Sequence, residues 1–282
     1  MRVLVMGATG RTGGEVARVC HEAGMAVRAA VRKTEAWSGP GEPVRFDLLD
    51  AATFPQALEG CDALFVMRPP PVTGAETWPP LFAAASEACI RHVVVSSVKG
   101  ADRNRFLPHR HVEDAARASG IPMAVLRPSD YMQNLESVHR EAVRRGEIRL
   151  PAGRGRSALI DVRDIGRCAA VVLKDGLTGE WALTGPEALN WHEVCAALSE
   201  ELDYTVRYRS ANPVLFLLQQ WRRGNPLGMS AVMTALYTVQ RLGLAAEVTE
   251  GVSTLTGEPP TQFREYAGRE RAVWLPPLKG SA

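Results

Sequence analysis

The sequence has few cysteines and lacks a long apolar run. Its cysteines are odd in number and widely spread, which excludes the short pairings typical of metal sites and redox pairs. We therefore expect buried thiols in a reducing cytoplasm and no metal site. These residues are Cys20, Cys61, Cys89, Cys168 and Cys195. The longest weakly polar stretch, residues 229–239, is far shorter than the roughly 20 residues that a membrane span requires, so a soluble protein without a membrane partner is predicted.

Neither sign of charge is in excess. Lys and Arg together number 33 and Asp and Glu number 31, which gives a net charge of +2 and no whole-chain reason to expect a nucleic-acid partner. The chain opens directly on a strand-like run, residues 2–6, without a leader of the secretory kind. We therefore expect a cytoplasmic protein, and its 282 residues are enough for one large domain and a smaller one.

Short β-rich runs alternate with helical patterns over the first two thirds of the chain. The runs cover residues 3–6, 26–31, 44–46, 63–67, 93–95, 124–126 and 181–183. Several are continuously apolar, which suits a parallel sheet covered on both faces rather than a half-exposed antiparallel one. The pattern predicts an α/β fold, a doubly wound parallel-sheet Rossmann domain, over residues 1–186.

After about residue 187 the alternation stops, and the sequence predicts a smaller, mainly helical C-terminal region on the substrate side, residues 187–282. Asn190 with Glu193 has the spacing of a helix N-cap with a first-turn acid. The region also holds large, adaptable apolar side chains suited to covering a flat hydrophobic substrate, although a helical core explains such residues equally simply. They are Phe216, Trp221, Met229, Met233 and Tyr237.

A glycine-rich loop follows the first predicted strand and opens the first predicted helix. In this position its glycines allow a tight turn, a close approach of the backbone to a pyrophosphate and tight helix packing. The N–H groups and dipole of the helix start then favour phosphate. The loop therefore predicts a dinucleotide site, with candidate residues Gly7, Thr9, Gly10, Arg11, Thr12 and Gly13.

The end of the second predicted strand selects between the two nicotinamide cofactors. An acid there binds the ribose 2′-hydroxyl group, whereas arginine accommodates a 2′-phosphate. Arg32 and Lys33 stand at this point, and Arg11 of the glycine loop can approach the same phosphate. NADP(H) is therefore preferred over NAD(H). In the alternative, Arg32 and Lys33 only solvate a turn and Glu35 is the ribose acid.

The motifs together resemble the NmrA-like branch of the atypical short-chain dehydrogenase/reductase superfamily. Besides the glycine loop and residues 31–33, they comprise residues 46–50, 96–98, 126–128, 160–165, 183–187 and 256–260, and so span nearly the whole chain. That family includes NAD(P)H-dependent quinone and triphenylmethane-dye reductases, reductases of natural-product pathways, and members that sense the dinucleotide without obvious turnover.

The resemblance also implies positions for the rest of the cofactor. Asp47 and Leu48 would meet the adenine, and Met67 and Arg68 would flank the ribose region. Ser96, Ser97 and Pro128 would approach the nicotinamide side. For Met67 and Ser96, roles as strand-end core and cap are equally good explanations.

The Tyr-x-x-x-Lys pair that most short-chain dehydrogenases use for proton transfer is missing, because no tyrosine is followed four places later by lysine. Three candidate catalytic residues remain, namely Ser97, His109 and Tyr131. His109 and Glu113 would share one helix face, a pattern that resembles the dye and quinone reductase branch, and a histidine can donate a proton or a hydrogen bond. An exposed helix-start histidine and a core tyrosine are the plainer alternatives.

These features predict an NADPH-dependent reductase that passes hydride to an electron-poor conjugated or aromatic small molecule, such as a quinone, enone, imine or dye. Such acceptors need little proton donation, which fits the missing pair. A non-catalytic NADP(H) sensor is the main alternative, and a non-redox epimerase or cyclase is a minor one. A monomer or homodimer is expected.

Overall fold

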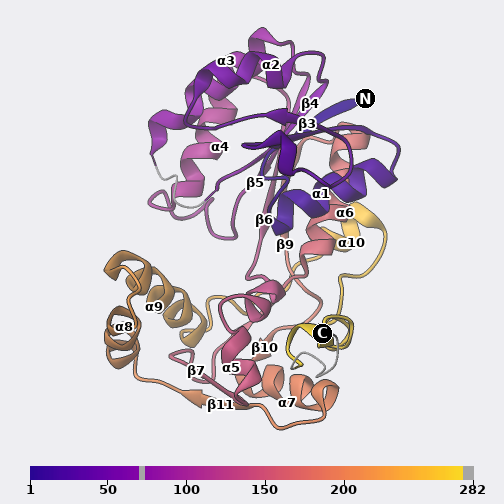
Figure 1. Cartoon of the computed structure of the whole chain (residues 1–282). Coiled ribbons are helices and arrows are strands. Elements are labelled where there is room, and N and C mark those ends of the chain that lie inside the picture. Colours follow the sequence, from indigo (N-terminus) through magenta and orange to yellow (C-terminus); the bar gives the residue numbers. More distant parts are fainter. Residues whose placement is uncertain (70–73, 276–282) are drawn as a thin grey trace. The chain divides into compact units, whose positions relative to one another are not determined.

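The structure is a computed structural model that describes residues 1–69 and 74–275. Its main sheet has seven strands, all parallel, in the order β3-β2-β1-β4-β5-β6-β9 (Figure 1). The strands are β1 (Arg2–Val5), β2 (Ala26–Val31), β3 (Glu42–Arg45), β4 (Ala63–Met67), β5 (His92–Ser96), β6 (Met123–Pro128) and β9 (Gly179–Leu183). Each coincides with one of the predicted runs to within a few residues, and the parallel order is that of a Rossmann-type sheet.

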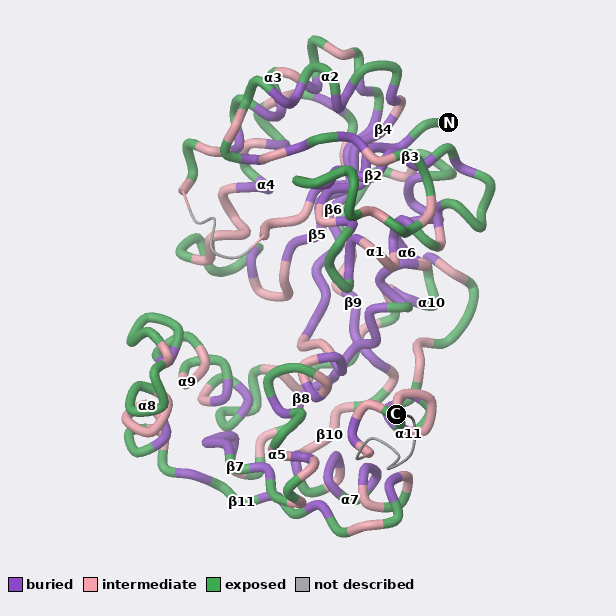
Figure 2. The backbone as a smooth tube through the Cα atoms, viewed as in Figure 1, coloured by how far each residue is buried: buried purple, intermediate pink, exposed green. Residues whose placement is uncertain are grey.

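Helices cover both faces of this sheet, as the continuously apolar strands require. On one face, Leu4, Leu64 and Val66 share a core with residues of α2 (Phe54–Leu58), α3 (Trp78–Glu87) and α4 (Pro108–Ala118). On the other, α1 (Arg11–Glu22) packs against α6 (Val162–Asp175), and α10 (Gly251–Thr256) packs against α6 and β9. The central strands are accordingly buried along most of their length (Figure 2). The predicted doubly wound α/β fold is confirmed.

The chain forms two compact units, each built from three segments. Unit 1 comprises residues 1–128, 162–183 and 250–259, and unit 2 comprises 129–161, 184–249 and 260–282. Residues 129–161, which the sequence predicts in the first domain, cluster with unit 2, and residues 250–259 of the predicted C-terminal region cluster with unit 1. For residues 129–161 the reason is that Val143 and Ile148 pack into the same core as Leu198 of the later segment. Residues 276–282 of the predicted C-terminal region lie outside the described residues.

Unit 2 is mainly helical, with two short two-stranded sheets. Strand β7 (Glu147–Leu150) pairs with β11 (Arg207–Ser210), and β8 (Arg156–Ser157) pairs with β10 (Leu189–Asn190). The other elements are η4 (Met132–Glu136), α5 (Arg140–Arg144), α7 (Trp191–Leu202), α8 (Pro213–Arg222), α9 (Leu227–Arg241), α11 (Phe263–Arg269) and η5 (Arg271–Val273).

The start of α7 confirms the cap expected from the sequence. The Asn190 side chain accepts the backbone N–H of Glu193, and the Glu193 carboxylate accepts the backbone N–H of Asn190, at 3.1 and 2.9 Å. This reciprocal pair satisfies two of the N–H groups that a helix start otherwise leaves without partners.

The cysteines depart from expectation at one position. Four are buried free thiols, but Cys89 is exposed. It follows α3 in a left-handed turn, with φ of 57°, where the chain leaves the helix at the surface. No helix within residues 1–69 and 74–275 has the length and apolar character needed to cross a bilayer.

Candidate functional site

The predicted cofactor residues of unit 1 gather at one edge of its sheet. Parallel strands share a carboxyl edge, and ligands of open α/β sheets bind there. The glycine loop follows β1, Arg32 and Lys33 follow β2, and Asp47 and Leu48 follow β3. Met67 and Arg68 stand at the end of β4, Ser96 and Ser97 at the end of β5, and Pro128 at the end of β6.

The glycine loop has the tight geometry that its sequence predicts. Gly7 has φ of +68°, and the backbone N–H of Gly10 donates to the carbonyl of Gly7 at 2.8 Å. A Cβ on Gly13 would lie 2.3 Å from the Gly7 carbonyl oxygen, so only glycine lets α1 approach β1 this closely. Gly10 caps α1 without a side-chain acceptor, and the first turn carries no acid. The helix start therefore offers its positive end to a ligand anion.

Side chains around the loop differ in how far they can reach a ligand. Thr9 and Arg11 are exposed, as are Arg32 and Lys33 after β2, whereas Thr12 is only 4% exposed. Met67 lies directly against the loop, because its Sδ is 2.5 Å from where a Gly7 Cβ would stand. The structure therefore brings Met67 and the glycine loop together.

The two residues expected near adenine have different surroundings. The Asp47 carboxylate accepts the backbone N–H of Leu49 at 3.0 Å and shapes the turn after β3. Leu48 is 8% exposed and belongs to the core that also contains Phe46 and Phe54. Its side chain therefore packs inward, and a ligand would meet mainly the neighbouring backbone.

Ser97 is held by a buried carboxylate on α4. Its hydroxyl donates to Glu113 Oε1 at 2.6 Å, and Arg127 of β6 donates to both oxygens of the same carboxylate, at 3.0 and 2.7 Å. Arg117 adds a contact at 2.9 Å. Burial alone would raise the pKa of Glu113, but the hydrogen bonds from Arg127, Ser97 and Arg117 outweigh it and lower this pKa to about 2. Glu113 is therefore ionised, and its carboxylate fixes the orientation of the Ser97 hydroxyl.

The hydrogen bonds of Glu113 were not predicted from the sequence. His109 and Glu113 were expected to share one helix face, and the structure adds that the Glu113 carboxylate binds Arg127 and Ser97. The sequence does contain a signal for this ion pair, because Arg127 interrupts the otherwise apolar buried strand β6. A charge at such a position requires an opposite charge nearby.

His109 stands at the start of α4, beside Arg68. Burial lowers the pKa of its imidazole to about 4, the positive charge of Arg68 acts in the same direction, and Glu113 opposes them. Its Nδ1 is buried without a hydrogen-bond partner among the described residues. At neutral pH His109 is therefore an uncharged ring that can donate or accept one further hydrogen bond, not an imidazolium acid.

Tyr131 belongs to unit 2, where it precedes η4 and its backbone bridges to Ile160. The residue before it, Asp130, is part of a polar cluster inside the same unit. Gln240 of α9 donates to Asp130 at 2.6 Å and accepts from the indole N–H of Trp191 at 2.9 Å. Burial raises the pKa of Asp130 to about 6, and hydrogen bonds from Gln240 and Asn134 act against this rise.

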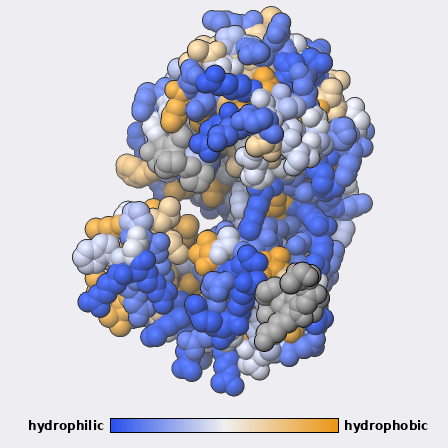
Figure 3. Space-filling model, in the orientation of Figure 1, coloured by the Kyte–Doolittle hydropathy of each residue, from blue (hydrophilic) through white to orange (hydrophobic). Residues whose placement is uncertain are grey.

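The large apolar residues of the C-terminal region divide into two sets. Phe216 and Tyr237 are buried in the core of unit 2, 3% and 8% exposed, whereas Trp221 and Met229 are 55% and 51% exposed. Further exposed apolar side chains on α9 follow Met229 at helical spacing, and they are Val232, Leu236 and Val239. Figure 3 shows hydrophobic surface over α8 and α9.

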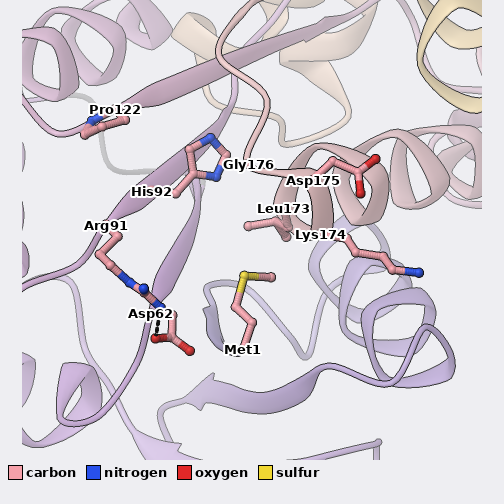
Figure 4. A pocket seen from close by; sticks show the side chains of 9 residues that line it. All are labelled: Met1, Asp62, Arg91, His92, Pro122, Leu173, Lys174, Asp175 and Gly176. Carbon is pink, nitrogen blue, oxygen red and sulfur yellow. Dashed lines mark hydrogen bonds and ion pairs between the residues drawn. The ribbon is translucent and has the colours of Figure 1, made fainter.

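A separate cavity of about 300 Å³ lies at the opposite edge of the unit 1 sheet (Figure 4). Asp62 precedes β4, His92 begins β5 and Pro122 precedes β6, so the cavity is at the amino edge. Asp62 is paired with Arg91 at 2.5 Å. Because the glycine loop is at the other edge, this cavity is not the candidate dinucleotide site.

Comparison with known proteins places the whole fold in one family. A model of the NmrA-like family matches residues 1–267. The chain belongs to this family. A similar curated protein, the NAD(P)H azoreductase of Xenophilus azovorans, is 32% identical, over 96% of this chain and 99% of that protein.

Solved structures similar to this chain carry the same fold. The NADPH-dependent quinone oxidoreductase of Escherichia coli, complexed with NADPH, has a TM-score of 0.85 at 22% identity, over 95% of this chain and 99% of its own. The triphenylmethane reductase of Citrobacter sp., complexed with NADP(H), has a TM-score of 0.83 at 22% identity, over 96% of this chain and all of its own. NmrA itself, a negative transcriptional regulator in complex with NAD, has a TM-score of 0.76 at 21% identity, over 96% and 94%.

Proposed function

We propose that the chain is an NADPH-dependent reductase that transfers hydride to an electron-poor conjugated or aromatic small molecule of the quinone, enone, imine or dye type, possible natural-product intermediates included. The observation that carries this proposal is the end-to-end similarity to an NAD(P)H azoreductase, at 32% identity. Relatives of the oxidoreductase class support the reductase role, and the glycine loop supports the cofactor.

The residues at the carboxyl edge of unit 1 fit a nicotinamide dinucleotide. The close approach at Gly13 and the start of α1 provide a cradle for a diphosphate. Two nearby side chains have buried polar atoms without partners among the described residues, namely Nε1 of Trp37, which packs against Ala8 of the glycine loop, and Nδ1 of His109, which stands beside Arg68. Arg11, Arg32 and Lys33 would favour NADP(H) over NAD(H) by meeting the 2′-phosphate.

When bound, the reduced dinucleotide supplies hydride. The Ser97 hydroxyl donates its hydrogen bond to Glu113. The Ser97 oxygen can therefore accept a hydrogen bond from a ligand but does not readily donate one. His109 is neutral and would orient a polar group of the acceptor through a hydrogen bond. Tyr131 is the third candidate to contact the acceptor.

This arrangement favours acceptors that stabilise the added electron pair themselves. The Ser97 proton is donated to Glu113 and His109 is uncharged at neutral pH, so neither is a ready proton donor, and the usual Tyr-x-x-x-Lys pair is missing from the sequence. The exposed apolar side chains of α8 and α9, Trp221 and Met229 among them, suit a flat hydrophobic molecule. We propose that unit 2 provides the substrate side of this protein.

The proposal is tested with purified protein, NADPH and a panel of acceptors: quinones, azo compounds, cationic dyes, iminium compounds and simple aliphatic ketones. We expect NADPH absorbance to fall with conjugated acceptors and to stay constant with the aliphatic ketones, and Gly13→Ala protein to give no turnover. Reduced dinucleotide carrying deuterium should deliver that label to the product.

Two results would favour other functions. Tight dinucleotide binding without turnover on any acceptor would favour the second candidate, an NADP(H) sensor, which the similarity to a negative transcriptional regulator supports. Turnover without transfer of deuterium to the product would favour an epimerase or cyclase on the same fold.

A further inference from the structure

Trp37 occupies a place between the glycine loop and the end of β2. It directly follows η1 (Thr34–Ala36), the short turn that continues the chain after Arg32 and Lys33. It packs against a small cluster formed by Ala8 of the glycine loop with Ala29 and Val31 of β2. In this fold the adenosine ribose lies between the glycine loop and the end of the second strand. Trp37 therefore borders the place of the ribose.

The indole of Trp37 has an unsatisfied donor. Its Nε1 is buried and has no hydrogen-bond partner among residues 1–69 and 74–275. A buried tryptophan N–H normally finds an acceptor, and leaving it without one costs free energy. A ligand that brings an acceptor to this point would remove that cost.

The loop is shaped around this ring. A Cβ on Gly39 would lie 2.5 Å from Cη2 and Cζ2 of the Trp37 indole, so the chain closes over the benzene end of the ring only because residue 39 is glycine. The residues between β2 and the ring, Arg32 to Ala36, are all exposed. The segment therefore exposes the side chains of Arg32 and Lys33 to solvent and covers the indole of Trp37.

We propose that the Trp37 indole N–H donates a hydrogen bond to the 2′-phosphate of NADP(H), as a neutral donor beside the cations Arg32 and Lys33. The inference rests on the proposed function and adds a residue that selects the phosphorylated dinucleotide. The N–H is buried in this structure, so the proposed hydrogen bond requires the residues that cover it to move aside. The 2′-hydroxyl of NAD(H) is uncharged and a weaker partner.

The chain offers a matched control for this inference. Trp78 of α3 also has a buried indole N–H without a partner among the described residues, but it is fully buried in the core under α2, α3 and α4. Trp37→Phe and Trp78→Phe each keep an aromatic ring and remove one unsatisfied donor. Only the first removes a donor beside the ribose.

Calorimetric titration of both variants with NADPH and NADH distinguishes a donor that binds the 2′-phosphate from a donor that is only buried in the core. We expect Trp37→Phe to weaken NADPH binding about tenfold or more, the range of a hydrogen bond to a charged group, and to leave NADH binding nearly unchanged. Trp78→Phe should change neither affinity. Equal affinities of Trp37→Phe and wild type for NADPH, or equal losses for both dinucleotides, would overturn the inference while the proposed function stands.

A spectroscopic readout keeps the test decisive if Trp37→Phe folds poorly. In protein labelled with ¹⁵N at its tryptophans, the Trp37 indole proton should move downfield when 2′-phosphoadenosine 5′-phosphate is added, and should move little with adenosine 5′-phosphate. Gly39→Ala, which displaces the ring but keeps the N–H, should reduce both the shift and the affinity for NADPH. An unmoved Trp37 signal at saturation would contradict the inference, and wild-type protein that binds no dinucleotide would overturn the proposed function with it.

Discussion

The Ser97 hydroxyl lies 2.6 Å from Oε1 of Glu113, and the same carboxylate receives two hydrogen bonds from Arg127. Ser97 directly follows β5, Glu113 belongs to α4 and Arg127 belongs to β6. The contact therefore links these elements at the edge of the sheet where the candidate site lies. Glu113 is fully buried, and a buried charge of this kind is tolerated only while its partners remain.

Glu113→Gln should therefore destabilise the protein. It leaves the buried Arg127 with only the more exposed Glu180 as counter-charge, at 2.8 Å, and we expect a loss of roughly 3 kcal/mol in the free energy of unfolding, measured by urea denaturation. Ser97→Ala is the matched control, because it removes one hydrogen bond and should cost about 1 kcal/mol. Equal urea midpoints for Glu113→Gln and wild type would contradict this account of the contact.

The role of His109 predicts a particular pH dependence. Burial holds the pKa of its imidazole at about 4, below the usual 6.5, so its charge does not change near neutral pH. We expect kcat/KM for an active acceptor to show no step near 6.5. His109→Gln, which keeps a hydrogen-bond donor, should retain more activity than His109→Leu. A step near 6.5 that disappears in His109→Gln would instead identify an imidazolium acid.

Arg32 should decide between the two cofactors. Arg32→Ala removes a guanidinium group from the end of β2, and we expect about tenfold or greater weakening of NADPH binding with little change for NADH. Arg264→Ala, an exposed arginine of unit 2 paired with Glu200, is the control and should alter neither. If Arg32→Ala weakened both dinucleotides equally, the residue would have no selecting role.

Protonation of Asp130 should stabilise the folded protein at low pH. Burial raises its folded-state pKa from 3.8 to about 6, so its contribution is fully present below pH 3.8 and is lost as the pH rises through 6. Asp130→Asn stays neutral, so the stability of wild type relative to this variant should rise by roughly 2–3 kcal/mol between pH 7 and pH 4. Thermal denaturation of both proteins across this range provides the measurement. A stability difference that stays constant over this range would contradict the raised pKa.

The sequence was informative wherever one local pattern decides the structure. The central strands β4 and β5 were predictable because each is a nearly continuous apolar run, and the Asn190 cap was predictable because its two partners are three residues apart. The glycine loop was predictable for the same reason, since Gly7 and Gly13 stand in one strand-to-helix turn.

The remaining features depend on tertiary contacts that no local pattern specifies. Glu113 and Arg127 meet across 14 positions of the chain, and Val143 joins a core that also contains Leu198 and other residues from after position 190. The burial of the Leu48 side chain in the core that contains Phe54 likewise depends on tertiary contacts. The unsatisfied N–H of Trp37 becomes visible only when its neighbours are known.

The most direct test of the account is calorimetric titration of purified protein with NADPH, NADP⁺, NADH and NAD⁺. We predict measurable binding to wild type, tightest for the phosphorylated pair. We also predict none to Gly13→Ala, whose added Cβ would stand 2.3 Å from the Gly7 carbonyl oxygen. Wild-type protein that gives no heat with any of the four dinucleotides would contradict the central claim.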